Sequence, residues 1–245
     1  MSSIVGYKRG RSLSRGSTRA RMVSRSSSSR KRNYVGPRRG YIINAGNQWA
    51  KGGSLTAYLR AFDPFPSKMR CRLRYSQGKT LSTAGSVATT LFRANGIFDP
   101  DFSGIGHQPY GHDTYEAIYQ KYIVVNSYIS VSVLSNTNQG AIGVSITDDN
   151  TVQGNYNTIK ETKGTKWIPI TYTGAPTVTN KFSLSMLDEA QQSNCQATFG
   201  ASPNQQMFYH VWYCAKNEGT DTAIDINVCI TYDVEVCELK DLGQS

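Results

Sequence analysis

Strict alternation of apolar and polar residues near the end of the chain narrowly limits the fold that this sequence can adopt. From residue 223 to residue 237, every second side chain is apolar. Successive side chains of a β-strand point to opposite faces of the sheet, so the pattern predicts a long strand with one covered face. The apolar positions are Ile224, Ile226, Val228, Ile230, Tyr232, Val234 and Val236.

A second alternating segment, residues 68–75 (KMRCRLRY), separates cationic from apolar side chains. The strand period predicts one apolar face and one cationic face. Four like charges about 7 Å apart on one face repel each other, and an anionic partner would relieve that repulsion. The alternative interpretation is a solvated strand face. The cationic positions are Lys68, Arg70, Arg72 and Arg74.

Further strands are expected at about 87–93, 122–135, 140–147, 166–172, 181–186 and 206–215. The segment 206–215 is apolar on both sides, which indicates an interior strand or a strand with a second contact. Pro169 cannot donate a ladder hydrogen bond and therefore predicts a strand at a sheet edge. We expect one helix, capped by Asp113, with an apolar face formed by Ala117, Ile118 and Tyr122.

These elements favour an all-β fold: a single eight-stranded antiparallel jelly roll of two packed sheets. The expected connections at 95–112, 148–165 and 187–205 are long, whereas a compact immunoglobulin-type sandwich has short turns. No apolar run approaches the roughly eighteen residues that a membrane span requires, so no membrane partner is expected. Five widely spaced cysteines without a CxxC pair favour a reducing, intracellular compartment.

The surplus of positive charge lies at the start of the chain. The first forty residues hold twelve of the 27 Lys and Arg residues and ten Ser, and the first acidic residue is Asp63. Such a segment has too little apolar mass to offset its chain entropy, so we expect a disordered basic N-terminal arm. The predicted organisation is an arm at 1–40, an extended connector at 41–66 and a jelly-roll domain at 67–240.

An arm of this kind neutralises phosphates in a salt-dependent manner that is largely independent of base sequence. A solubility or localisation tail is the alternative. Arg30, Lys31, Arg32, Arg38 and Arg39 also resemble a nuclear localisation signal, whose partner would be a nuclear import receptor. The expected nucleic-acid-binding residues are the cationic row at 68–74 together with Lys8, Arg9, Arg11, Arg15, Arg19, Arg21, Arg25, Arg30, Lys31, Arg32, Arg38 and Arg39.

The loop that follows residue 92 contains several potential metal ligands, but not at metal-binding spacing. Asp-Pro-Asp and Gly-rich dipeptides are ordinary turn formers, and no HxH, HExxH or EF-hand pattern is present. His210 lies in an apolar strand and is expected to be a satisfied core or interface histidine. Without a nucleophile motif or P-loop, we expect no enzyme activity, catalytic residue, cofactor or metal. The potential ligands are Asp99, Asp101, His107, His112 and Asp113.

The same loop resembles a segment of the capsid proteins of small circular single-stranded DNA viruses that encode a replication initiator. The resemblance rests on Phe92, Asn95, Ile97, Phe98, Asp99, Pro100, Asp101, Gly106, His107, Gln108, Pro109, Gly111, Asp113, Tyr119, Tyr122 and Val124. It implies a viral jelly roll, an icosahedral shell of the smallest class, and an arm inside that shell. As a rigid, turn-rich insert, the loop suits a subunit contact through Phe98, Asp99, Pro100, Asp101, Gly106, His107, Gln108 and Pro109.

The sequence thus favours a capsid protein that assembles with copies of itself and packages a single-stranded DNA genome, located in the virion and in the host nucleus during assembly. One alternative is a cellular Ser/Arg-rich RNA-binding protein with a β-sandwich domain, although no GXXG loop or aromatic RNP motif is present. The other alternative is a jelly-roll lectin or trimeric ligand, which fits the basic arm and the cysteine usage poorly.

Overall fold

A computed structural model describes residues 65–134, 138–151, 155–172, 174–217 and 219–241 of the chain. The predicted arm at 1–40 and most of the predicted connector at 41–66 lie outside these residues. Their boundaries therefore stay predictions.

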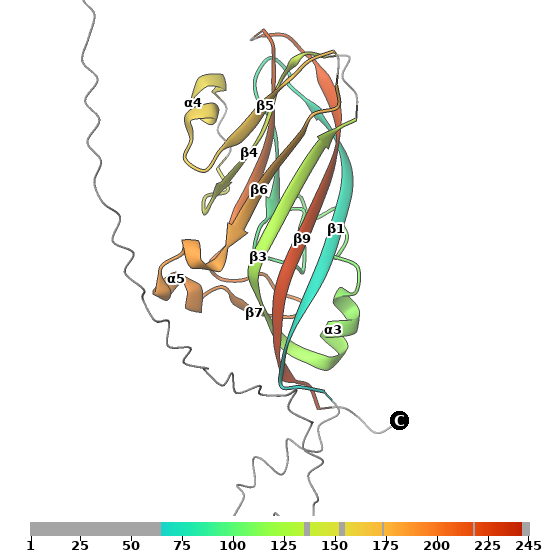
Figure 1. Cartoon of the computed structure of the whole chain (residues 1–245), viewed down its shortest axis with the longest axis vertical. Coiled ribbons are helices and arrows are strands. Elements are labelled where there is room, and N and C mark those ends of the chain that lie inside the picture. The colour runs from blue at the N-terminus through green and yellow to red at the C-terminus, as the bar shows by residue number, and fades with distance from the viewer. Residues whose placement is uncertain (1–64, 135–137, 152–154, 173, 218, 242–245) are drawn as a thin grey trace, which may run out of the picture. The chain divides into compact units, whose positions relative to one another are not determined.

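Nine strands make up most of the described domain (Figure 1). They are β1 (Lys68–Ser82), β2 (Ala88–Arg93), β3 (Tyr119–Val133), β4 (Gly140–Thr147), β5 (Lys166–Ile170), β6 (Thr177–Ser183), β7 (Gln196–Thr198), β8 (Phe208–Ala215) and β9 (Ala223–Leu239). Helical segments connect some of them: α3 (His112–Ile118), α4 (Tyr156–Glu161), the 3₁₀ turn η2 (Leu184–Met186) and α5 (Glu189–Ser193). No described helix is long and apolar enough to cross a membrane.

The strands form two antiparallel sheets with the strand order of a jelly roll. One sheet has the order β1-β9-β3-β6, with β7 pairing to β3, and the other has the order β2-β8-β4-β5. When the short β7 is left out and the other eight strands are numbered along the chain, the order is 1-8-3-6 in one sheet and 2-7-4-5 in the other. This is the strand order of a jelly roll. The predicted all-β jelly roll is confirmed. The predicted strand count of eight is wrong by β7, whose three residues are too few to show a period.

Burial of one face determines where the strands begin and pair. The inward side chains of β9 alternate without exception from Ile224 to Val236, and each is at most 2 % exposed. These residues meet the inward faces of β1 and β3 and the facing sheet in one apolar cluster. In β3 a bulge between Val124 and Asn126 shifts the register, so the alternation resumes one residue later.

Strand β8 is buried on both sides, as its composition predicted. Its inward residues join the main cluster, whereas Trp212 and Cys214 pack with Ala141 and with Ile159 of α4 on the outer side of the second sheet. Trp212 fits there because Gly143 of β4 has no side chain: a Cβ at this position would lie 2.2 Å from the indole. Pro169 lies in β5, an edge strand, as predicted.

Two expectations about helices are wrong. Asp113 does not cap α3; Gly111, with a left-handed φ of 87°, precedes the helix, and Asp113 lies in its first turn. Tyr122 belongs to β3, because the helix ends at Ile118 and the chain continues as a strand.

The short helices α4 and α5, with six and five residues, were not expected, since neither is long enough to show a helical period. The expected strand at 181–186 lies at Thr177–Ser183 and ends in η2.

Candidate nucleic-acid interface

The cationic row lies on the outward face of β1, as the alternation predicted. Three of its side chains are 70, 73 and 69 % exposed, while Leu73 and Tyr75, which alternate with them, are buried in the core. The row consists of Lys68, Arg70, Arg72 and Arg74.

Two acidic residues of β9 neutralise half of the charge of this row. Register places Arg70 opposite Glu235 and Arg72 opposite Asp233. The Nε atom of Arg72 lies 2.7 Å from Oδ1 of Asp233, and the Nε atom of Arg70 lies 3.3 Å from Oε2 of Glu235. Lys68 approaches the same Glu235 at 3.7 Å. The hydrogen bond that Arg72 donates to Asp233, followed by the charge of that carboxylate, raises the pKa of Arg72.

Carboxylates of the same domain thus relieve part of the predicted repulsion at these three residues, and the binding of nucleic acid by the row stays a prediction. Exposed ion pairs contribute only about 0–1 kcal/mol each, but they lower the net charge of the row. Arg74 differs: it stands opposite Thr231, and no acidic side chain pairs with it in the described part of the chain. Two positive charges of the row therefore stay uncompensated: one is shared by Lys68 and Arg70, which face a single carboxylate, and the other is that of Arg74.

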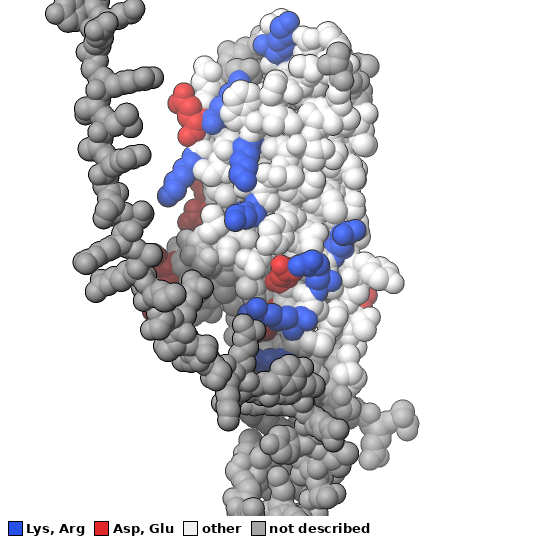
Figure 2. All heavy atoms as spheres, viewed as in Figure 1, with Lys and Arg blue, Asp and Glu red and all other residues white. Residues whose placement is uncertain are grey.

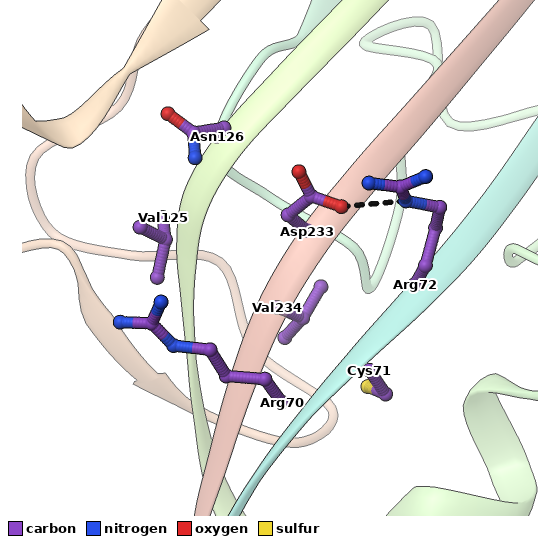
Figure 3. Close-up of a pocket in the computed structure, with 7 residues that line it drawn as sticks. All are labelled: Arg70, Cys71, Arg72, Val125, Asn126, Asp233 and Val234. Atoms are coloured by element: carbon purple, nitrogen blue, oxygen red, sulfur yellow. Dashed lines mark hydrogen bonds and ion pairs between the residues drawn. The ribbon is translucent and has the colours of Figure 1, made fainter. Parts of the chain in front are cut away.

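A shallow hollow of about 380 Å³ lies between β1, β9 and β3 (Figure 3). In Figure 3 the two arginines reach over β9 from β1, and Asn126 faces them from β3. Burial raises the pKa of Cys71 to about 11, although a hydrogen bond with Tyr115 lowers it in part. The thiol is therefore neutral at pH 7. The lining residues are Arg70, Cys71, Arg72, Val125, Asn126, Asp233 and Val234.

The hollow belongs to a wider cationic surface, the outward face of the β1-β9-β3-β6 sheet, which we call the open sheet face. Figure 2 shows Lys and Arg side chains spread over this face with Asp and Glu among them. Lys121 of β3 pairs with Glu238 at 2.8 Å, whereas Lys181 of β6 has no acidic partner among the described residues. Sequence alone did not single out Lys181, because it stands isolated in its strand.

The loop that resembles the capsid segment is tied to β2 at its beginning. Arg93 donates from its backbone N–H to the carbonyl of Pro100, and its guanidinium donates to the carbonyl of Asp99 at 2.5 Å. The same guanidinium lies 3.3 Å from the Asp99 carboxylate. Phe102 donates its N–H to Leu91. The backbone from Pro100 to Phe102 thus continues the edge of β2.

Asp101 is the deepest anchor of the loop. Its carboxylate is fully buried and lies 2.6 Å from the ammonium of Lys79 of β1, which is 17 % exposed. Ser103 donates to the other carboxylate oxygen from its N–H and its hydroxyl. Gly106 is required beside this pair, since a Cβ there would lie 2.7 Å from Asp101 and 2.8 Å from the hydroxyl of Tyr75.

The far end of the loop lies against β1. The ring of His107 stacks on Tyr75 with centroids 4.6 Å apart, and Tyr110 donates its N–H to the carbonyl of Arg74. Pro109 is buried, and Gln108 is partly buried. Three apolar side chains of this anchored loop are exposed: Phe98 is 37 % exposed, Phe102 36 % and Ile105 81 %. Phe102 also packs edge-on against Phe208, so Phe98 and Ile105 are the candidates for a contact with another molecule.

The five potential metal ligands do not come together as one group. Asp99, Asp101 and His107 have the separate partners described above, whereas His112 and Asp113 gather with Glu116 at the start of α3. The Nδ1 atom of His112 lies 3.1 Å from Asp113 and 3.7 Å from Glu116, and its buried ring packs edge-on against Phe199. Glu116 reaches the cluster because a helix brings residues i and i+4 together.

His210 is satisfied, as predicted. Its ring is buried and its Nε2 lies 2.8 Å from the carbonyl of Asp149 and 3.0 Å from the hydroxyl of Thr147. Burial lowers the pKa of His210 and outweighs the backbone carbonyl and the charge of Asp149, which both raise it. The imidazole is therefore neutral at pH 7. The twelve cations expected between Lys8 and Arg39 lie outside the described residues, and their contacts stay predictions.

Comparison with known proteins finds likeness among solved structures of viral coats. No protein-family model and no curated protein sequence matches the chain. A 60-mer of the BFDV capsid protein is similar at 9 % identity, covering 74 % of this chain and 100 % of its own, with a TM-score of 0.46. The structure of Cocksfoot mottle virus is 13 % identical, with 71 % of this chain and 96 % of its own covered and a TM-score of 0.47. The structure of Turnip yellow mosaic virus is 10 % identical, with 73 % of this chain and 99 % of its own covered and a TM-score of 0.44. At these scores the jelly-roll assignment rests on the strand order alone.

Replacing Asp101 by Asn should destabilise the domain by about 3 kcal/mol at pH 7, because the substitution leaves Lys79 largely buried without its counter-charge. Burial opposes ionisation of Asp101, but hydrogen bonds from Lys79 and Ser103 outweigh it and hold its pKa below the ordinary value. A carboxylate with a lowered pKa stabilises the fold above its unfolded pKa of about 4, and this contribution is lost as the pH falls through the folded pKa.

The free energy of unfolding, measured with urea between pH 7 and pH 2.5, should therefore differ most between the two proteins at pH 7 and converge below pH 4. Asp148→Asn, at an exposed loop position, is the matched control and should leave stability unchanged at every pH. Equal stability of Asp101→Asn and the parent at pH 7 would show that the loop does not depend on this pair.

Proposed function

We propose that the chain is the capsid subunit of a small circular single-stranded DNA virus. It assembles with copies of itself into an icosahedral shell of the smallest class and packages the genome through its basic arm and the open sheet face. The observation that carries the proposal is the cationic row on the outward face of β1, in a jelly roll whose first strand follows the basic segment 1–40 after the connector at 41–66. The sequence resemblance of residues 92–124 to capsid proteins of such viruses supports the same assignment.

Charge matching gives the scale of packaging. Residues 1–79 contain nineteen Lys and Arg and one Asp. If each net positive charge meets one phosphate, about sixty subunits neutralise on the order of a thousand phosphates, which suits a small genome. The signal at Arg30–Arg32, Arg38 and Arg39 would bring the subunit to the host nucleus through an import receptor before it enters the virion.

Self-association is supported by the loop of residues 98–109. A buried ion pair and a backbone ladder hold this loop, so Ile105 and Phe98 are presented at fixed positions although water covers them in the single subunit. Exposing apolar side chains on a rigid segment costs free energy that a subunit contact recovers. The loop thus fits a contact between neighbouring subunits.

Electron microscopy of the purified full chain tests the assembly. Closed particles of uniform diameter that protect nucleic acid from nuclease are expected. Discrete monomers in every buffer would exclude a capsid and would favour the cellular RNA-binding alternative, whose monomer or dimer would bind RNA without forming particles.

Replacing the twelve Lys and Arg residues of the arm by Gln should lower the packaged nucleic acid by about two thirds, since the arm holds about two thirds of the net positive charge of residues 1–79. The ratio of absorbance at 260 and 280 nm of purified particles measures this loss. The matched control is an arm of identical composition in shuffled order, which should package normally because phosphate neutralisation does not depend on the order of charges. Full packaging by the Gln variant would rule out this role for the arm.

Replacing Ile105 by Asp should block or strongly weaken particle formation while leaving the fold intact, because a charge would enter an apolar contact. Size-exclusion chromatography measures assembly, and thermal unfolding confirms the fold. Asn150→Asp adds the same charge to an exposed loop elsewhere and should assemble normally. Normal particles from Ile105→Asp would place the subunit contact at another surface.

A further inference from the structure

Strand register aligns five residues in one line across the open sheet face. Tyr110 bridges to Arg74 of β1, Arg74 stands opposite Thr231 of β9, Thr231 stands opposite Tyr128 of β3, and Tyr128 stands opposite Lys181 of β6. Directly opposed residues of neighbouring strands project to the same face. We call this line of Tyr110, Arg74, Thr231, Tyr128 and Lys181 the transverse row.

The two tyrosines of the transverse row are open to water. Tyr110 is 92 % exposed and Tyr128 is 46 % exposed, although nearly every other tyrosine of the two sheets is buried in the core. Three strand spacings separate them, about 14 Å. Arg74 stands between them.

The cations of the transverse row carry uncompensated charge. Neither Arg74 nor Lys181 pairs with an acidic side chain in the described ranges, in contrast to the ion-paired Lys68, Arg70 and Arg72. Lys68 and Arg70 share one carboxylate and Arg72 has its own, so an anion meets less competition from acidic side chains at the transverse row than at the beginning of β1.

A second hollow, of about 320 Å³, lies beside Tyr128 on the side of β6. Lys166 joins it from the edge strand β5, which lies next to β6 (Figure 1). Two cations, one aromatic ring and several hydroxyl groups thus surround one opening. The lining residues are Tyr128, Ile129, Ser130, Lys166, Thr179, Asn180, Lys181, Cys229 and Thr231.

We propose that the transverse row is a binding site for a single-stranded polynucleotide, which crosses the sheet perpendicular to its strands. Bases stack on Tyr128 and Tyr110, Arg74 contacts the phosphate between them, and Lys181 with Lys166 contacts the backbone at the second hollow. Alternating aromatic rings and cations match a strand whose unpaired bases expose their faces and whose backbone is anionic. The site refines the proposed function, on which it rests, by separating base stacking from the phosphate neutralisation assigned to the arm.

The test compares two fluorescently labelled ten-residue oligonucleotides, oligothymidylate and an abasic oligomer of the same length, by fluorescence anisotropy with the full chain. The arm contacts phosphates, so it contributes equally to both affinities and cancels in their ratio. The parent should prefer oligothymidylate. Tyr128→Ala and Tyr110→Ala should each lower that preference by about fivefold to a hundredfold without changing affinity for the abasic oligomer.

Conservative variants separate stacking from structural damage. Tyr128→Phe should keep the preference, because the ring remains, and Tyr172→Ala, an exposed tyrosine off the row, should leave it unchanged. Arg74→Gln should weaken binding of both oligonucleotides alike and reduce the dependence on salt by about one phosphate contact. The same measurement with oligouridylate tells whether the site prefers RNA. Tighter binding of oligouridylate than of oligothymidylate would support the site and contradict the DNA assignment.

An unchanged preference in both Tyr→Ala variants would overturn the transverse row as a binding site, even if the chain forms DNA-filled particles. Conversely, a preference that depends on Tyr128 in a chain that never assembles would support the site and remove the capsid proposal. The two failures are therefore distinguishable.

Discussion

The position of β9 between β1 and β3 is the constraint on which the rest of the domain depends. Because the side-chain period of a strand is two, a slip of one residue would turn Ile226, Ile230 and their neighbours outward, so burial fixes the register. The same register then sets Asp233 and Glu235 opposite the arginines of β1 and leaves Arg74 opposite a threonine. The electrostatics of the open sheet face is thus a consequence of how the core is packed.

The anchored loop shows a similar dependence of surface on interior. Lys79 extends from β1 to the buried Asp101, and Arg93 extends from β2 to Asp99, so the first two strands hold the loop in place. Four of the loop positions that carry the family resemblance take part in this anchoring: Asp99, Pro100, Asp101 and Gly106. The residues that could meet another subunit, Ile105 and Phe98, stand outside the anchors and gain fixed positions from them.

Sequence alone predicted what a single strand determines, and it missed what needs two strands. The alternation found β9, the boundaries of β4 and the outward row of β1, because each is a local pattern. It missed the acidic partners of that row, since the sequence of one strand does not indicate which residue some 160 positions away will stand opposite. It also missed the transverse row for the same reason, and it missed β7, α4 and α5 because each is shorter than the window a period requires.

The two proposed contacts with nucleic acid, those of the arm and those of the sheet, differ in their physics. Phosphate neutralisation by many cations falls steeply as salt rises, because it depends on counterion release. Stacking on an exposed ring depends on contact with a base and is far less sensitive to salt. An arm can therefore gather a polyanion but cannot fix where it lies, whereas a tyrosine held by the register of a sheet can. In the proposed particle, the arm would condense the genome, and the transverse row would place a short stretch of it at the same position in every subunit.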